Sequence, residues 1–289
     1  MTNCWIIYNG SLISEKFVDQ ANLMAEAVKK YDVEPIVLKN CDVLMDLQTE
    51  LVNRPDFVIF LDKDILLGQF LKQQGIPVFN DPDIIEICDN KAKQYLKLSQ
   101  GNIPIPKTII APKVYRNFSI TQTGYFEKVI EQLKLPMIIK EAHGSFGMKV
   151  YLIETEQQFY EKVKELSGVD FVFQEFIASS TGRDIRVNIV GDEVVAAMYR
   201  HSETDFRANI TNGGKAERIE LTEEQIKIAK QAALVLGAEY AGVDLLFGEN
   251  EQPIVCEVNA AAHIRNIYNV TGVNVGEKLT QYILRKLAL

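Results

Sequence analysis

The chain has 289 residues, 47% of them hydrophobic, and this length corresponds to about two domains. Its formal net charge of -8 and pI near 5.1 argue against a general binder of nucleic acid or anionic membrane, because such surfaces need clustered lysine and arginine. No apolar stretch approaches the roughly 18 residues of a membrane span. The four cysteines are far apart in the sequence and form no Cys-x-x-Cys motif, so we expect them to be reduced thiols. We expect a cytoplasmic protein with no nucleic-acid and no membrane partner.

About the first 85 residues alternate between strand and helix patterns. Strands separated by helices predict a parallel sheet with helices on its faces. The first strand-to-helix turn, Asn9-Gly10-Ser11, lacks Gly-x-Gly-x-x-Gly, so a dinucleotide-binding fold of the usual kind is not supported. The strands are expected at 5–8, 34–38, 56–61 and 77–79. One helix is expected at 14–30, and a second follows the third strand and ends at residue 74.

The rest of the chain predicts an α+β arrangement with mainly antiparallel pairing. A helix over 84–99 should lead into a proline-rich joint at 103–108, because residues before proline avoid the helical region. Further helices are expected at 125–133, 156–166, 222–236 and from 275, with strands at 136–140, 149–153, 171–176, 184–190 and 193–199. We divide the chain into domains at 1–85, 86–170 and 171–289.

Two apolar runs near the end, 242–246 and 253–259, flank a turn-forming Gly248-Glu249-Asn250-Glu251 and predict a hairpin. Glu257 and Asn259 are two apart on one strand and should face the same way, with Asp244 on the partner strand. Two carboxylates and an amide form an oxygen set suited to Mg²⁺. The alternative is the solvent face of an ordinary half-buried hairpin.

Two other segments have weaker functional signals. Lys140 ends a strand before a loop with Gly144 and Gly147, and such a loop allows backbone amides to approach phosphate, although it is also an ordinary turn. The apolar strand 171–173 runs into Gln174-Glu175-Phe176-Ile177, where freed backbone groups beside an aromatic ring suit an adenine base. In isolation this segment also fits a strand that ends in a loop.

The motifs of the chain follow one another in a fixed order. They are Asp89-Asn90-Lys91, Lys140 with its loop, Gln174 to Ile177, Gly182 to Arg186, Gly191 to Met198, Asp205 to Asn209, Gly213-Gly214, Gly242 to Asp244 and Glu257 to Asn259. In this order they resemble the motifs of the ATP-grasp ligases. The similarity is greatest to the RimK type, which ligates amino acids, typically glutamate, onto peptide or protein acceptors. It runs from about residue 85 to the end, and the first domain resembles the family's Rossmann-like pre-ATP-grasp domain more loosely.

The resemblance implies ATP and one or two Mg²⁺ or Mn²⁺ ions as cofactors, and it implies roles residue by residue. Phosphates would meet Lys91, Lys140 and Ser145. Adenine would meet the segment Gln174, Glu175, Phe176 and Ile177, and the ribose would meet Asp184. The phosphoryl region would meet Arg207 and Asn209, with Lys140, Arg186 and Arg207 neutralising charge. The metal ligands would be Asp244, Glu257 and Asn259.

The segment after Asn259 departs from the RimK pattern. It lacks the usual proline, and Arg265-Asn266 looks more like the LysX branch, where ligation is to the end of a carrier protein. We expect Arg265 to bind a substrate carboxylate by a bidentate contact, with Asn266 and His263 nearby. A lone loop histidine is also compatible with a structural role.

The resemblance implies an ATP-dependent carboxylate-amine ligase that works through an acylphosphate and releases ADP and phosphate. The expected partners are an amino acid as the small-molecule substrate and a peptide, protein or amino-compound acceptor. We also expect the chain to associate with itself as a homo-oligomer. Loop 144–148 is the expected lid, because acylphosphates need shielding from water. Two alternatives stay open: a peptide maturase that modifies a precursor peptide, and an ATP-binding module without catalysis.

Overall fold

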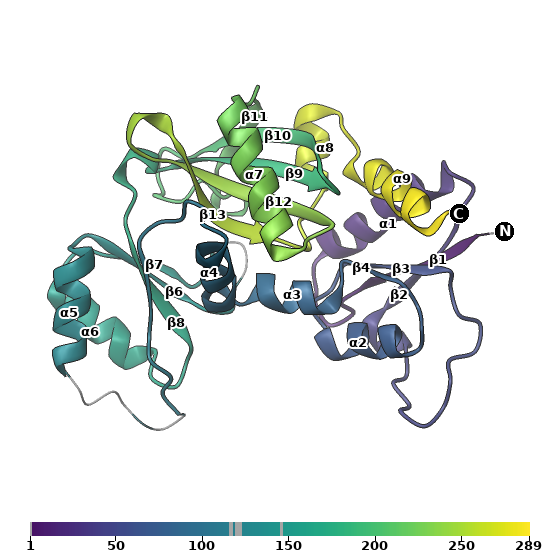
Figure 1. Cartoon of the computed structure of the whole chain (residues 1–289), viewed down its shortest axis with the longest axis horizontal. Helices are drawn as coiled ribbons and strands as arrows, with labels where there is room; N and C mark the ends of the chain where they lie inside the picture. The colour runs from purple at the N-terminus through teal and green to yellow at the C-terminus, as the bar shows by residue number, and fades with distance from the viewer. Residues whose placement is uncertain (1, 116–117, 119–122, 145–146) are drawn as a thin grey trace.

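In the computed structural model the chain is described over residues 2–115, 118, 123–144 and 147–289 (Figure 1). Its N-terminal part is a parallel sheet in the strand order β2-β1-β3-β4, as the sequence predicted. The strands are β1 (Asn3–Tyr8), β2 (Glu34–Lys39), β3 (Phe57–Phe60) and β4 (Val78–Phe79), and the helices between them are α1 (Glu15–Lys29) and α2 (Ile65–Gln73).

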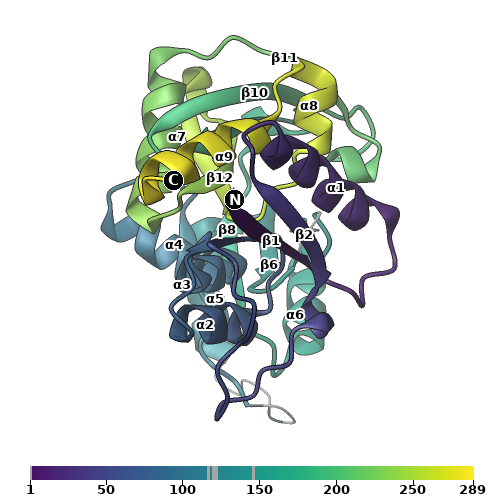
Figure 2. The ribbon, with the colours of Figure 1, turned by 90° about the vertical axis from the view of Figure 1, so that its right-hand side faces the viewer.

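Both faces of the inner strands β1 and β3 are buried, which explains their continuous apolar runs, whereas the edge strand β2 is largely exposed. Side chains alternate along β1, so Cys4 and Ile6 enter one core while Trp5 and Ile7 enter another. The C-terminal helix α9 (Val275–Leu287) packs beside α1 on one face of the sheet, and α2 lies on the other (Figure 2). The end of the chain therefore completes the N-terminal lobe.

The single helix expected over 84–99 is wrong, because the structure has two helices there, α3 (Pro82–Asp89) and α4 (Lys91–Gln100). Asn90 separates them with φ -102° and ψ 104°, and its side-chain oxygen accepts a hydrogen bond from the Lys93 amide at 3.0 Å. An asparagine that caps the next helix in this way ends the preceding one. The break places Lys91 in the first turn of α4.

A central lobe contains an antiparallel sheet in the order β5-β8-β6-β7, covered by α5 (Thr123–Leu133) and α6 (Glu156–Glu165). It has its own core, in which Phe159 stacks on Phe173 with ring centroids 5.4 Å apart. Because β8 belongs to this sheet, we propose to end the second domain after Glu175, and the three-domain division stays a prediction. The strands are β5 (Thr108–Ile110), β6 (Met137–Glu141), β7 (Val150–Ile153) and β8 (Phe171–Glu175).

The third sheet has the order β11-β10-β9-β12-β13, is antiparallel and packs against α7 (Glu223–Leu236). Its strands are β9 (Arg183–Val190), β10 (Glu193–His201), β11 (Lys215–Arg218), β12 (Tyr240–Phe247) and β13 (Pro253–Asn259). The short β11 and the helix α8 (Arg265–Thr271) were not predicted. Single 3₁₀ turns are η1 (Asn40–Asp42), η2 (Ala178–Ser180), η3 (Ile210–Asn212) and η4 (Glu249–Glu251).

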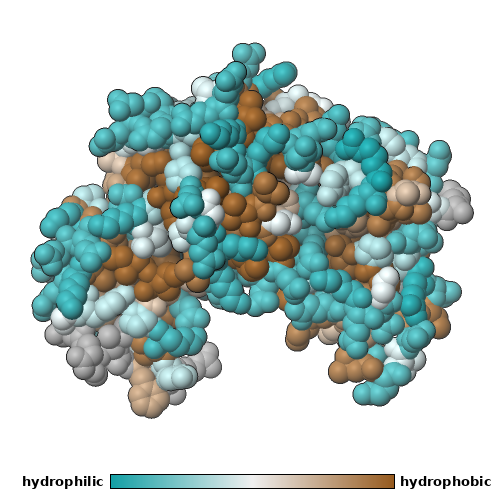
Figure 3. Space-filling view, viewed as in Figure 1, coloured by the Kyte–Doolittle hydropathy of each residue, from teal (hydrophilic) through white to brown (hydrophobic). Residues whose placement is uncertain are grey.

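On the face drawn in Figure 3, apolar side chains gather over α4 and α7, where Leu96 is 52% and Leu234 is 78% exposed. Over the described ranges, no helix has both the length and the apolar character needed to cross a bilayer. The expected homo-oligomer stays a prediction.

Candidate active site

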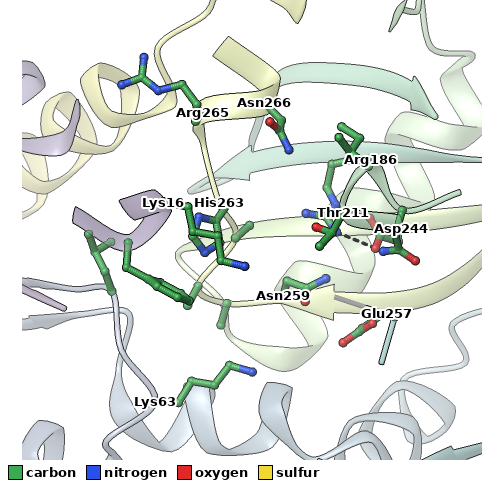
Figure 4. Close-up of a pocket in the computed structure, with 18 of the residues that line it drawn as sticks. Lys16, Lys63, Arg186, Thr211, Asp244, Glu257, Asn259, His263, Arg265 and Asn266 are labelled. Atoms are coloured by element: carbon green, nitrogen blue, oxygen red, sulfur yellow. Dashed lines mark hydrogen bonds and ion pairs between the residues drawn. The ribbon is translucent and has the colours of Figure 1, made fainter. Parts of the chain in front are cut away.

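A cavity of about 580 Å³ opens between the N-terminal sheet and the third sheet (Figure 4). It brings together a large part of the predicted site, from strands β9, β12 and β13 and from the loop that follows β13. The predicted residues that line it are Arg186, Asn209, Asp244, Glu257, Asn259, His263, Arg265 and Asn266.

The predicted hairpin is confirmed, and a β-bulge sets which of its side chains enter the cavity. Asp244 is the register partner of Glu257, but the next residue, Leu245, pairs with Val255, so Cys256 is the extra residue. The bulge lets Val255 and Val258 both reach the apolar core while Glu257 and Asn259 face the cavity.

A buried ladder of alternating charges lies at the base of the cavity. Arg186 binds Asp244 through both carboxylate oxygens, with Nη2 to Oδ2 at 2.7 Å, and Arg200 Nη2 lies 3.0 Å from Asp244 Oδ1. Burial alone would raise the pKa of Asp244, but the two guanidinium groups outweigh it and lower the pKa. Asp244 is therefore ionised and shared between two arginines.

Asp184 belongs to the same ladder. Its two carboxylate oxygens accept hydrogen bonds from Arg200 at 2.7 Å each, and the residue is only 8% exposed. Asp184 orients Arg200 under Asp244. Its predicted contact with the ribose stays a prediction.

The donor set fits a hard divalent cation in part. Glu257 and Asn259 offer oxygens at the cavity wall, and the nearest cation to Glu257 is Lys91 Nζ at 3.7 Å. Asp244 would join them only after Arg186 moves, since both of its oxygens are engaged. Among the described residues no three His, Cys, Asp or Glu side chains form a ready metal cluster. The fit therefore rests on Glu257 and Asn259.

Lys91 and Lys140 approach β13 from the central lobe and do not line the cavity. Lys140 Nζ donates to the Tyr95 hydroxyl at 2.9 Å and lies 3.7 Å from Cys256 Sγ, with the residue 6% exposed. Lys91 Nζ donates to the Gly144 carbonyl at 2.9 Å. Lys91 and Lys140 thus form a second group of residues, which adjoins the cavity at Glu257.

The predicted adenine segment extends from the end of β8 on the same central-lobe side. The Gln174 side chain is buried and donates to Thr108 Oγ1 at 2.8 Å, and the Glu175 amide donates to the Lys107 carbonyl at 2.9 Å. Both groups are committed to the fold, so adenine recognition by the Gln174 side chain or the Glu175 amide is not supported. Phe176 and Ile177 follow the strand, and the Ile177 carbonyl accepts from the Ser180 amide.

Arg207 joins the lobes. Its guanidinium pairs with Asp205 at 2.7 Å and donates to the Gly147 carbonyl at 2.5 Å. Ser145, predicted to contact phosphate, and part of the predicted lid 144–148 lie outside the described residues.

Arg265, which we expect to bind a substrate carboxylate, already holds a carboxylate of the protein. Its Nε and Nη2 each donate to Asp19 of α1 at 2.7 Å. His263 contacts the edge of Phe17 with ring centroids 5.3 Å apart. Burial, followed by the charges of Lys16 and Arg186, lowers the pKa of His263 to about 4, so its ring is neutral near pH 7.

Residues of the N-terminal lobe form the part of the cavity that sequence reasoning missed. They follow or begin elements at the carboxyl ends of β1 and β3, which is where open parallel sheets bind ligands. That positional rule, applied to the predicted strands 5–8 and 56–61, would have singled out the polar residues that follow them. The missed residues are Asn9, Lys16, Asp19, Asp62 and Lys63.

Comparison with known proteins gives a consistent result. Residues 88–283 match the RimK-like ATP-grasp domain. An uncharacterized protein of Mycoplasma pneumoniae is 31% identical over 249 residues, which cover 84% of this chain and 85% of that protein. The tetrahydromethanopterin:alpha-L-glutamate ligase of Methanocaldococcus jannaschii is 34% identical over 217 residues, covering 73% of this chain and 71% of that enzyme.

The fold comparison agrees. A RimK domain ATP-grasp protein of Sphaerobacter thermophilus superposes with a TM-score of 0.74, 15% identity, and coverage of 97% of this chain and 99% of that one. ATP-grasp ligases use ATP and Mg²⁺. The chain therefore belongs to the RimK-like ATP-grasp family and is an ATP-grasp ligase with an N-terminal parallel sheet.

Proposed function

We propose that this ligase uses ATP to convert a carboxylate into an acylphosphate and then joins it to an amine, with L-glutamate as one of the two partners. The similarity to an alpha-L-glutamate ligase over 73% of the chain is the observation that carries this proposal. The cavity suits charged amino acids, because lysine, arginine, aspartate and glutamate side chains line it together. The other partner is a peptide, a protein or a small amino compound.

The two groups of residues would have different roles. Lys91, Lys140 and Arg207 would neutralise the phosphates, and Phe176 with Ile177 would contact adenine through the backbone. Glu257 and Asn259 would hold a divalent cation, and Asp244 would complete the set. When bound, Mg²⁺ or Mn²⁺ supplies charge neutralisation at the outer phosphates of ATP.

The reaction does not require a covalent bond between the substrate and the protein. A carboxylate is a poor electrophile, and transfer of the γ-phosphoryl group makes it reactive with release of ADP. Attack by the amine forms a tetrahedral oxyanion and then expels phosphate. Arg186, which lines the cavity beside Asp244, would stabilise that anion. No nucleophilic side chain is needed.

A screen of ADP and phosphate release tests the proposal. Single amino acids and dipeptides are paired in the presence of ATP and Mg²⁺, and products are identified by mass spectrometry. We expect a product heavier by one glutamate residue, and no product with Glu257→Gln. ATP binding without ADP release under every pairing would favour the non-catalytic module. Turnover only with a precursor peptide, and none with free glutamate, would favour the peptide maturase.

A further inference from the structure

Five carboxylates line the cavity, and four of them have a cationic partner among the described residues. These four are held by arginine or lysine from a neighbouring element. Asp62 differs, because the hydrogen bonds that its carboxylate accepts come from neutral donors, and the charge of Lys63 acts on it without such a bond among the described residues. The four ion pairs are Asp19 with Arg265 at 2.7 Å, Asp89 with Lys63, Asp244 with Arg186, and Glu257 with Lys91 at 3.7 Å.

The Asp62 carboxylate is fixed in position. It lies two residues after the end of β3, is 5% exposed, and accepts hydrogen bonds from Asn9 Nδ2 at 3.1 and 3.2 Å and from the Lys63 amide at 2.7 Å. The Asn9 side-chain oxygen accepts from the Ser11 amide at 2.9 Å, which keeps its nitrogen turned toward Asp62. The result is a rigid, buried anion at the cavity wall.

A buried carboxylate that accepts hydrogen bonds only from neutral groups is costly, and the cost is offset when a positive charge binds to it. Burial raises the pKa of Asp62, and the hydrogen bonds from the Lys63 amide and Asn9, together with the charge of Lys63, offset only part of this. A metal ion would need further oxygen ligands, and the described residues offer no cluster of three suitable side chains. A single compact cation that donates hydrogen bonds fits Asp62 better.

We propose that Asp62 binds the ammonium group of the amine substrate. This inference rests on the proposed ligase function. ATP has no ammonium group, whereas the amine substrate enters as an ammonium ion and loses that proton before it attacks the acylphosphate. Asp62 lies at the carboxyl end of a parallel strand, the edge at which such sheets bind ligands. Asn9 is a positioning residue that aims the carboxylate.

The experiment uses the full chain with ATP, Mg²⁺ and the carboxylate substrate identified by the screen above, and with L-glutamate as the amine or hydroxylamine in its place. Hydroxylamine is uncharged near neutral pH and converts an acylphosphate into a hydroxamate. For Asp62→Asn we expect the KM for glutamate to rise by about tenfold or more, while hydroxamate formation and the KM for ATP stay within about twofold. Asn9→Ala should raise the same KM by a smaller factor.

Asp56→Asn is the matched control, because Asp56 is exposed just before the other end of β3 and should leave all three values unchanged. Thermal unfolding checks that each variant is folded. If Asp62→Asn does not fold, the KM of Asn9→Ala for glutamate tests the role of Asp62. Equal loss of the glutamate and hydroxylamine reactions in Asp62→Asn, or an unchanged KM, would overturn the role of Asp62 alone. A wild-type protein that makes neither product would overturn the proposed function instead.

Discussion

Arg186 and Asp244 are register partners on β9 and β12 and form a two-point ion pair under the cavity. Arg200 of β10 donates to the same carboxylate, and it also donates to both carboxylate oxygens of Asp184. Positive and negative groups thus alternate across three strands with little exposure to water. Asp244 consequently has a structural function in addition to any contact with a metal ion.

Asp244→Asn and Glu257→Gln should therefore differ in stability although both should lose activity. Removing the buried charge leaves Arg186 and Arg200 underpaired, and we expect a loss of about 3 kcal/mol or more in the free energy of unfolding. Glu257 has one long ion pair at 3.7 Å, so Glu257→Gln should cost less than about 1 kcal/mol. Urea unfolding and Mg²⁺-dependent ADP release measure the two effects. Equal stability of the two variants would contradict the structural function of Asp244.

Lys140 offers a test of the nucleotide side, with Lys149 as its control. The Lys140 ammonium is buried between Tyr95 and Cys256, whereas the Lys149 side chain is 51% exposed and pairs with Glu141. We expect Lys140→Met to weaken ATP binding by about tenfold or more and Lys149→Met to change it by less than about twofold. Calorimetry with a non-hydrolysable ATP analogue gives both values. A similar effect of the two substitutions would argue against phosphate contact by Lys140.

His263 should make the fold sensitive to mild acid. Its folded-state pKa of about 4 lies below the ordinary 6.5, so the unfolded chain binds the proton more readily. Stability is complete above about pH 6.5 and falls as the pH drops toward 4. Relative to His263→Asn, the wild type should lose about 2 kcal/mol more of its unfolding free energy between pH 7.5 and 5. Parallel pH profiles of the two proteins would show that His263 is not the group concerned.

The sequence predicted the elements whose patterns are local. The parallel strands, the final hairpin and the antiparallel third sheet follow from apolar periodicity and turn residues. The division of 84–99 was missed because Asn90, a capping residue, interrupts a segment that otherwise has continuous helical character. The short β11 and α8 lack enough residues for a periodic signal.

The site was predicted only where its residues share a hairpin or a motif. Glu257 and Asn259 face one way because they are two apart on a strand, and the bulge at Cys256 has no counterpart in the pattern. Asp19 and Arg265 are separated by 246 residues, so nothing in either local sequence indicates that they pair. Partner choice in buried charge ladders depends on strand order, which single-sequence reasoning did not supply.

The Asp19–Arg265 pair gives the last prediction, which concerns how a substrate carboxylate would reach Arg265. The side chains are 40% and 36% exposed, so the pair contributes less than about 1 kcal/mol to stability, and the apolar core between α1 and α9 is independent of it. Asp19 therefore acts mainly as a competitor for the guanidinium. Removing its charge should make Arg265 more available to a bidentate carboxylate.

We expect Asp19→Asn to lower the KM for the carboxylate-bearing amino acid and Arg265→Ala to raise it by about tenfold or more, both with unchanged melting temperature and ATP affinity. Steady-state kinetics across amino acid concentrations checks the opposite signs. In the double variant the effect of Asp19→Asn should vanish, because it acts through Arg265. If both single substitutions raise the KM alike, the two residues work as one structural unit and Arg265 does not receive the substrate. Loss of ATP affinity in Arg265→Ala would count against a role confined to the amino acid.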